Sequence, residues 1–181
     1  MNTTLPDLER SARRAYELGR ARLGAARGAL ALVLPLAAVT LLGAPALLAL
    51  VLGGGLAVLF GYAQFKGQAL GRGARVGLLL GSFGALVPAM VRASGACCLG
   101  ASCESTCFTA CVLIGLCTGA VAAVVAARDP RPVVHGTSAA VVMLLATGLG
   151  CSALGLAEFL GVAAGLTVGG ASGVLRTVRA T

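Results

Sequence analysis

Residues 28–65 read GALALVLPLAAVTLLGAPALLALVLGGGLAVLFGYAQF, a stretch of 38 positions without one charged side chain. A membrane-spanning helix needs about 20 apolar residues, so this stretch is too long for one span and long enough for two. The expected break is Gly43-Ala44-Pro45, because proline cannot donate an interior helical hydrogen bond and glycine tolerates a turn. We therefore predict two spans, near residues 28–43 and 45–65.

The composition of the whole chain agrees with a membrane protein. The 181 residues are 58% hydrophobic and 11% charged, and the mean hydropathy is +0.96. A soluble domain carries about 25% charged residues, so this chain has too few charges to cover a water-facing surface. Four further apolar stretches predict spans near residues 76–93, 104–127, 133–152 and 154–175. The predicted fold class is an all-α integral membrane protein with six short transmembrane helices.

The positions of the basic residues predict the orientation of these spans. The net charge is +8, and six arginines precede the first apolar run: Arg10, Arg13, Arg14, Arg20, Arg22 and Arg27. A basic connection with Lys66, Arg72 and Arg75 follows the second predicted span. With the N-terminus in the cytoplasm, Arg92 is the only basic residue that faces outward, which satisfies the positive-inside rule. We therefore predict a multi-pass protein of the inner (cytoplasmic) membrane with both termini cytoplasmic, and no direct binding of nucleic acid.

This topology divides the chain into three segments. Residues 1–27 form a basic amphipathic cytoplasmic segment, residues 28–175 the transmembrane domain, and residues 176–181 a cytoplasmic tail. In the first segment, apolar or small residues recur between arginines, as in a basic amphipathic helix. Such a helix lies on anionic lipid or docks an acidic cytoplasmic protein, and both interpretations stay open. The predicted partner-binding residues are Arg10, Arg13, Arg14 and Tyr16.

Small residues are expected to pack the helices against one another through Gly and Ala faces. Glycine recurs every four positions in the last span, at Gly161, Gly165, Gly169 and Gly173. These positions form a slowly wrapping groove that a neighbouring backbone can approach closely. Packing within one chain is the favoured interpretation, and a homo-oligomer interface is the alternative.

Cysteines give the chain its main functional signal, since six of the seven lie between residues 97 and 117. Cys97 and Cys98 fall in the predicted outer turn between the third and fourth spans. Cys151, near the end of the fifth span, should reach the same outer level, where thiols oxidise or meet metal ions. The remaining four would lie on one helix within an arc of roughly 120° and a rise of roughly 21 Å: Cys103, Cys107, Cys111 and Cys117.

Three interpretations of these thiols compete. Disulfides could tie the third, fourth and fifth spans together, although seven thiols cannot all pair. A conduit would use Cys111 and Cys117 as a ladder that passes a soft cation inward, although both also suit plain apolar packing. A sensor would respond to an oxidant or to a thiophilic metal ion. Its residues would be Cys97, Cys98, Cys103, Cys107 and Cys151, with the first four as metal ligands.

No enzyme signature accompanies the cysteines. The chain has no Ser-His-Asp combination at a plausible shared depth, no phosphate loop and no pair of buried carboxylates, so an enzyme is not predicted. The single histidine, His135, belongs to the cytoplasmic side in this topology. We interpret it as an interfacial residue rather than as a ligand of the outer thiol site.

The layout of the chain resembles the NrsF-type membrane anti-sigma factors. The matching pieces are the cysteines from Cys97 to Cys107 in and after the outer turn, Pro130-Arg131-Pro132 before the fifth span, and Gly148-Leu149-Gly150-Cys151 at its end. The resemblance implies that the cytoplasmic segment holds a sigma factor at the membrane and releases it when the outer thiols meet metal or oxidant. A shorter piece, Ala96-Cys97-Cys98-Leu99-Gly100, is similar to the vicinal cysteine pair of mercuric-ion transporters.

The sequence therefore favours a thiol-based membrane sensor or regulator of the anti-sigma type. One alternative is a soft-metal-ion transporter that uses the cysteine ladder. Another is a structural membrane subunit with disulfide-tied helices.

Overall fold

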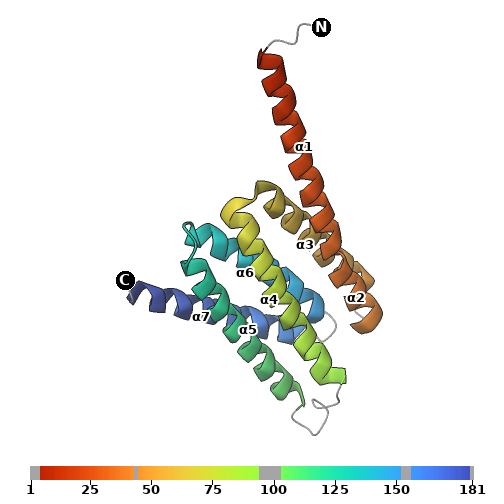
Figure 1. Ribbon diagram of the computed structural model, residues 1–181. Coiled ribbons are helices and arrows are strands. Elements are labelled where there is room, and N and C mark those ends of the chain that lie inside the picture. The colour runs from red at the N-terminus through yellow and green to blue at the C-terminus, as the bar shows by residue number, and fades with distance from the viewer. Residues whose placement is uncertain (1–4, 43–44, 94–102, 152–155, 180–181) are drawn as a thin grey trace.

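The computed structural model describes residues 5–42, 45–93, 103–151 and 156–179. Seven helices and no strands occupy these described residues (Figure 1). The helices are α1 (Leu5–Ala31), α2 (Val33–Leu42), α3 (Ala46–Lys66), α4 (Gln68–Ala93), α5 (Cys103–Ala127), α6 (Pro132–Cys151) and α7 (Leu156–Arg179).

Five helical stretches among the described residues are long and apolar enough to cross a membrane. The first, Leu8–Thr40, combines most of α1 with α2, and each of α3, α4, α5 and α6 supplies one more. The described apolar part of α7, Phe159–Ser172, is shorter. The prediction of a multi-pass, all-helical membrane protein is thus confirmed. The choice of membrane and the cytoplasmic location of the termini stay predictions.

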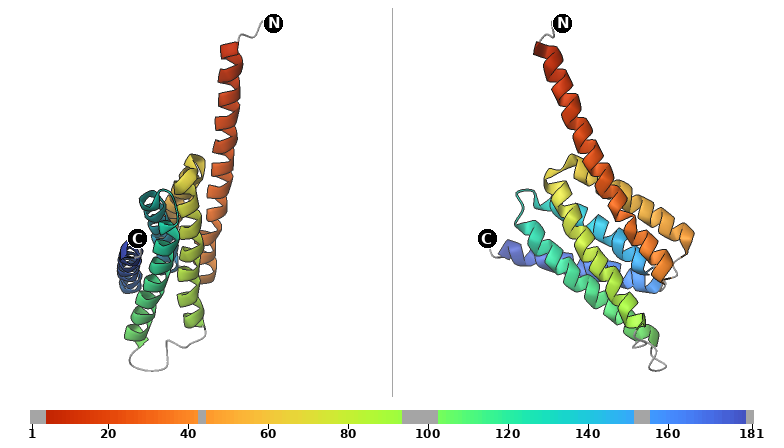
Figure 2. Two further views of the ribbon diagram at one scale, coloured as in Figure 1. Left: turned by 60° about the vertical axis from the view of Figure 1, so that its left-hand side comes forward. Right: turned by 45° about the vertical axis from the view of Figure 1, so that its right-hand side comes forward.

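The helices pack mainly as three pairs. α5 lies along α7, α4 along α6, and α1 along α3. The N-terminal part of α1 projects from the bundle and extends well beyond the other helices (Figures 1 and 2). One buried cluster, with Leu56, Phe60 and Leu149, joins the α1–α3 side to α6. A second, with Cys111, Met143 and Val162, lies between α5, α6 and α7.

Glycines allow the close pairing of α5 and α7. A Cβ atom added at Gly165 would meet the carbonyl oxygen of Val112, and one added at Gly169 would meet that of Leu116. A Cβ atom added at Gly161 would meet the ring of Phe108. The predicted glycine groove therefore faces α5 of the same chain at these three positions, while the surroundings of Gly173 lie outside the described residues.

Two helix boundaries differ from those expected from the sequence. The first predicted span, near residues 28–43, is divided between α1, which ends at Ala31, and α2, which begins at Val33. The third was expected near residue 76, but α4 begins at Gln68. The reason is the turn at Gly67 and Gln68, which both have positive φ values, +66° and +49°. Glycine adopts such a conformation without strain. Arg72 and Arg75 are therefore helical residues rather than parts of a connection.

Candidate functional site

The N-terminal half of α1 is an exposed basic arm. Every side chain described from Leu8 to Gly19 is exposed, including the predicted partner-binding residues. Arg13 pairs with its neighbour one turn on, at 3.2 Å from Glu17, and both side chains are largely exposed. An exposed pair of this kind contributes little to stability. The arm thus presents its arginines and Tyr16 to the surroundings rather than to the bundle.

The second half of α1 is fixed to α3. Arg20 donates from Nη2 to the carbonyl oxygens of Phe65, at 2.5 Å, and Lys66, at 2.7 Å. These carbonyls belong to the end of α3, where carbonyl groups have no N–H partner within their own helix. One turn further along α1, Gly24 and Gly61 allow the two backbones to approach closely. The arm is therefore the extension of a helix that is held by the bundle.

Gln64 links three helices where α3 ends. Its side chain is buried, and Oε1 accepts hydrogen bonds from Nη1 of Arg27 and from Nε of Arg75, both at 3.0 Å. Its Nε2 donates to the carbonyl oxygen of Gly71 at 3.0 Å. α1, α3 and α4 thus meet at one amide group, on which two positive charges converge.

Asp129 forms a second polar junction, between α4 and the turn from α5 to α6. Its Oδ2 accepts from Nε of Arg72 at 2.8 Å and lies 3.1 Å from Nδ1 of His135. Its Oδ1 accepts from the backbone N–H of Arg131 at 3.0 Å. The hydrogen bonds from Arg72 and Arg131 outweigh burial and hold the pKa of Asp129 well below its ordinary value of 3.8.

His135 is buried between neighbouring elements of the protein, with 4% of its surface exposed. Asp129 is ionised, so Nδ1 of His135 is the donor in their hydrogen bond. Nε2 has no hydrogen-bond partner among the described residues. His135, in the first turn of α6, therefore anchors the turn that precedes this helix. The role depends on α4 lying next to that turn, which sequence patterns do not reveal.

Three of the five predicted sensing cysteines occupy helix positions at the opposite end of the bundle from these polar junctions. Cys103 and Cys107 belong to the first two turns of α5, and Cys151 is the last residue of α6. Because α5 leads into the Asp129 turn and α6 leads out of it, both helices carry their cysteines at the far end. Cys97 and Cys98 lie outside the described residues, as do the side chains of Cys103, Cys107 and Cys151.

The two deeper cysteines of α5 occupy different environments. Cys111 is 1% exposed and packs in the cluster with Met143 and Val162. Cys117 is exposed on the outside of the bundle. Among the described side chains, no group of three His, Cys, Asp or Glu residues could hold a metal ion. The predicted metal ligands of the outer turn are not among those side chains.

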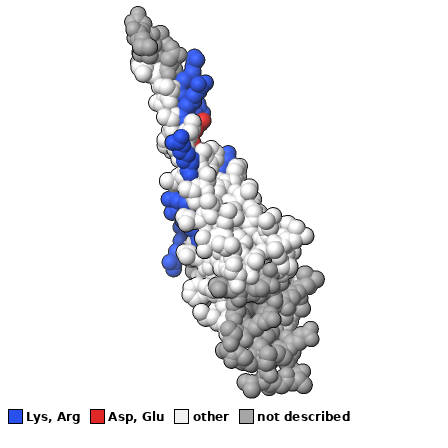
Figure 3. Space-filling view, turned by 90° about the vertical axis from the view of Figure 1, so that its right-hand side faces the viewer, with Lys and Arg blue, Asp and Glu red and all other residues white. Residues whose placement is uncertain are grey.

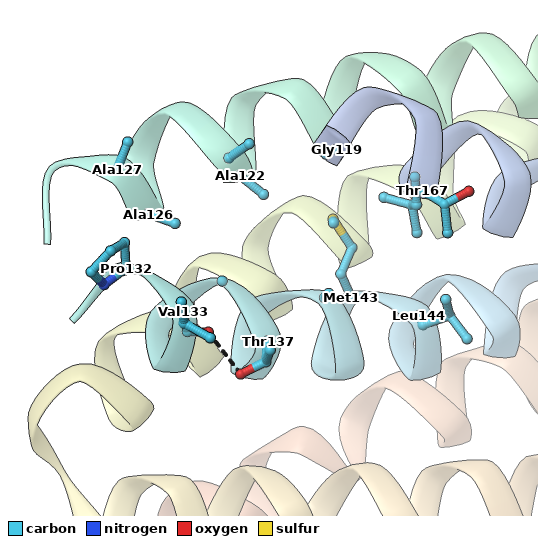
Figure 4. Close-up of a pocket in the computed structure, with 15 residues that line it drawn as sticks. Gly119, Ala122, Ala126, Ala127, Pro132, Val133, Thr137, Met143, Leu144 and Thr167 are labelled. Carbon is cyan, nitrogen blue, oxygen red and sulfur yellow. Dashed lines mark hydrogen bonds between the residues drawn. The ribbon is translucent and has the colours of Figure 1, made fainter. Parts of the chain in front are cut away.

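A cavity of about 670 Å³ opens between α5, α6 and α7. Its walls are small or apolar, with Gly119 and Ala122 from α5, Val133 and Met143 from α6, and Thr167 from α7 (Figure 4). The hydroxyl of Thr137, which also lines the cavity, donates a hydrogen bond of 2.9 Å to the carbonyl oxygen of Val133. The lining therefore offers no charged group, so the cavity suits apolar material.

Comparisons with known proteins add no family to this description. No protein-family model, no curated protein and no solved structure matches the chain.

Proposed function

We propose that this protein is a thiol-based membrane regulator of the anti-sigma type. Five thiols respond to an oxidant or a thiophilic metal ion: Cys97, Cys98, Cys103, Cys107 and Cys151. The basic arm of α1 holds a cytoplasmic partner such as a sigma factor. The resemblance in layout to NrsF-type proteins supplies the identity of the partner class.

The observation that carries the proposal is the continuity of α1. One helix includes both the exposed arm with Arg13 and Arg14 and the half that Arg20 fixes to α3. A partner held on the arm therefore contacts an element whose position depends on the bundle. A membrane subunit with only a structural role needs no such exposed basic extension.

A path from the thiols to the arm is available through the polar junctions. A disulfide or metal–thiolate bond at the start of α5 would move α5 against its neighbours. Its far end leads to Asp129, which is bonded to Arg72 of α4. In α4, Arg75 shares Gln64 with Arg27 of α1. Strain at one end of α5 would thus reach α1 through two hydrogen-bonded junctions.

The environments of Cys111 and Cys117 favour a sensor over a soft-metal transporter. A ladder requires successive thiols to face one shared pathway. Cys111 points into a packed apolar cluster, whereas Cys117 lies on the outer surface of the bundle. A sensor confined to the end of the bundle does not need either residue.

The test is copurification of cytoplasmic proteins with the full chain in its membrane, quantified by mass spectrometry. One protein should be captured by the wild type and lost from a variant that combines Arg10→Glu, Arg13→Glu and Arg14→Glu. Oxidant should release it from the wild type. Oxidant should not release it when Cys97, Cys98, Cys103 and Cys107 are all replaced by Ser. A capture that neither the charge reversal nor the oxidant changes would contradict the proposal.

A further inference from the structure

We propose that the junction of α1, α3 and α4 is a binding site for the phosphate group of an anionic phospholipid, held by Arg27 and Arg75 and positioned by Gln64. This site uses neither the cysteines nor the exposed arm of α1. The proposed coupling path from α5 to α1 passes through the same Gln64 junction, but lipid binding does not require that path.

The junction leaves two positive charges without a negative partner among the described side chains. Arg27 and Arg75 each donate one hydrogen bond to the same neutral oxygen of Gln64. Among the described side chains, the carboxylates in ion pairs are engaged elsewhere, Glu17 with Arg13 and Asp129 with Arg72. Two guanidinium groups close together repel each other, and a neutral amide does not cancel that repulsion. An anion between them would.

The N–H donors of Arg27 and Arg75 have the number and geometry that a phosphate group requires. A guanidinium group carries five N–H donors, and each of these two arginines uses one on Gln64. Planar groups with several remaining donors suit the paired oxygens of a phosphate. Because Gln64 is buried and its Nε2 is bonded to Gly71, its oxygen has a fixed position from which both arginines are held. The site is therefore organised before the ligand arrives.

The site lies near the turn that joins α3 to α4. Gln64 lies two residues before the end of α3, and Arg75 lies two turns into α4. Helical side chains lean toward the N-terminus of their helix, so Arg75 reaches back toward the α3–α4 turn. Arginines near helix ends extend in this way toward the headgroup region of a bilayer. A lipid phosphate is the anion that is concentrated at that level.

The surrounding surface matches this assignment. Arg20 and Lys66 add positive charge at the end of α3, where Arg20 bonds to the last carbonyls. Figure 3 shows the basic side chains along α1 and the adjoining edge of the bundle, while the rest of the described surface on that face is nearly free of charge. This boundary between charged and uncharged surface is what the headgroup level of a membrane requires.

The key variant is Gln64→Glu. A carboxylate at this position keeps an acceptor for both arginines and cancels one of their two positive charges, so the attraction of the phosphate is weakened. The control is Arg22→Gln, which makes the same change in net charge at an exposed position of α1. The full-length protein would be placed in nanodiscs of equal parts phosphatidylglycerol and phosphatidylcholine, and the lipids that remain bound would be counted by native mass spectrometry.

Gln64→Glu should lower the ratio of bound phosphatidylglycerol to phosphatidylcholine about tenfold, the effect of losing one charge-assisted contact. Arg22→Gln should leave the ratio unchanged. Added inorganic phosphate should not displace the lipid. An unchanged ratio in Gln64→Glu, an equal loss in Arg22→Gln, or displacement by inorganic phosphate would each overturn the assignment. Should thermal unfolding show that Gln64→Glu does not fold, Arg75→Gln at an exposed position replaces it, with the same expectations.

Discussion

Asp129 accepts a hydrogen bond of 2.8 Å from Arg72, a residue 57 positions earlier in the chain. The contact joins α4 to the turn between α5 and α6. It also brings together a base that precedes the third predicted span and an acid that lies between the fourth and fifth predicted spans. Since His135 and the backbone of Arg131 also contact this carboxylate, the turn is held from three directions.

The lowered pKa of Asp129 predicts a loss of stability in acid. A carboxyl group whose pKa is lower in the folded than in the unfolded protein stabilises the fold above its unfolded pKa. That stabilisation disappears as the pH falls below about 4 toward the folded pKa. The Tm of the detergent-solubilised wild type should therefore fall over this range. Asp129→Asn should have a lower Tm at pH 7 and a smaller decrease in acid.

The control for this prediction is Glu17→Gln, which removes a carboxylate from an exposed ion pair on the arm. Its Tm should follow that of the wild type at every pH. Parallel Tm curves for Asp129→Asn and the wild type would show that the carboxylate does not couple protonation to folding.

Close packing of α5 and α7 predicts different effects for two glycines of α7. A Cβ at Gly165 would meet the carbonyl oxygen of Val112, whereas one at Gly170 has no described atom within 4 Å. Gly165→Ala should therefore lower the free energy of unfolding by about 1–3 kcal/mol, the cost of overpacking. Gly170→Ala should leave it unchanged or raise it by about 0.5–1 kcal/mol, since alanine favours the helix. Unfolding in increasing SDS measures both, and equal values would contradict the proposed α5–α7 interface.

Local sequence signals predicted the features that depend on local chemistry. Pro45 lacks an N–H for a helix interior, and α3 begins at the next residue, as expected. The position of the α3–α4 turn was not predicted, because the positive charges of Arg72 and Arg75 suggested that these residues belong to a connection. Their charges are accommodated in a helix because Asp129 and Gln64 lie beside them, and both contacts depend on tertiary structure.

Helix pairing was likewise beyond the sequence. Glycine repeats occur in several helices, so the repeat in α7 indicates a close neighbour without identifying it. Its partner is α5, with Gly115 and Gly119 on the facing side against the carbonyls of Val162 and Leu166. The burial of His135 depends in the same way on α4, where Gly73 and Gly77 let α6 approach. Neither choice of partner is encoded in a local pattern.

Arg20 should control the attachment of α1 to α3. Replacing it by Gln removes two hydrogen bonds from a charged donor to the carbonyls that end α3. Backbone amides in the second half of α1 should then exchange with deuterium about tenfold faster, because hydrogen bonds to charged groups contribute about 1.5–3 kcal/mol and part of this is recovered by water. Arg22→Gln, which removes an equal charge from the exposed face, should not change the exchange rate. Equal rates in both variants would show that packing alone holds α1.

The sidedness of the cysteine turn is the prediction on which the sensing function depends most directly. A protein that keeps only Cys97 and Cys98 should react with a membrane-impermeant maleimide in intact spheroplasts after mild reduction, because the positive-inside rule puts this turn outside. A matched protein without native cysteines but with Arg22→Cys carries its thiol on an exposed part of α1 and should react only after lysis. Mass shifts of the purified proteins measure both reactions. Reaction of the Arg22→Cys protein alone in intact spheroplasts would reverse the orientation, and an oxidant outside the cell would then have no direct access to the thiols.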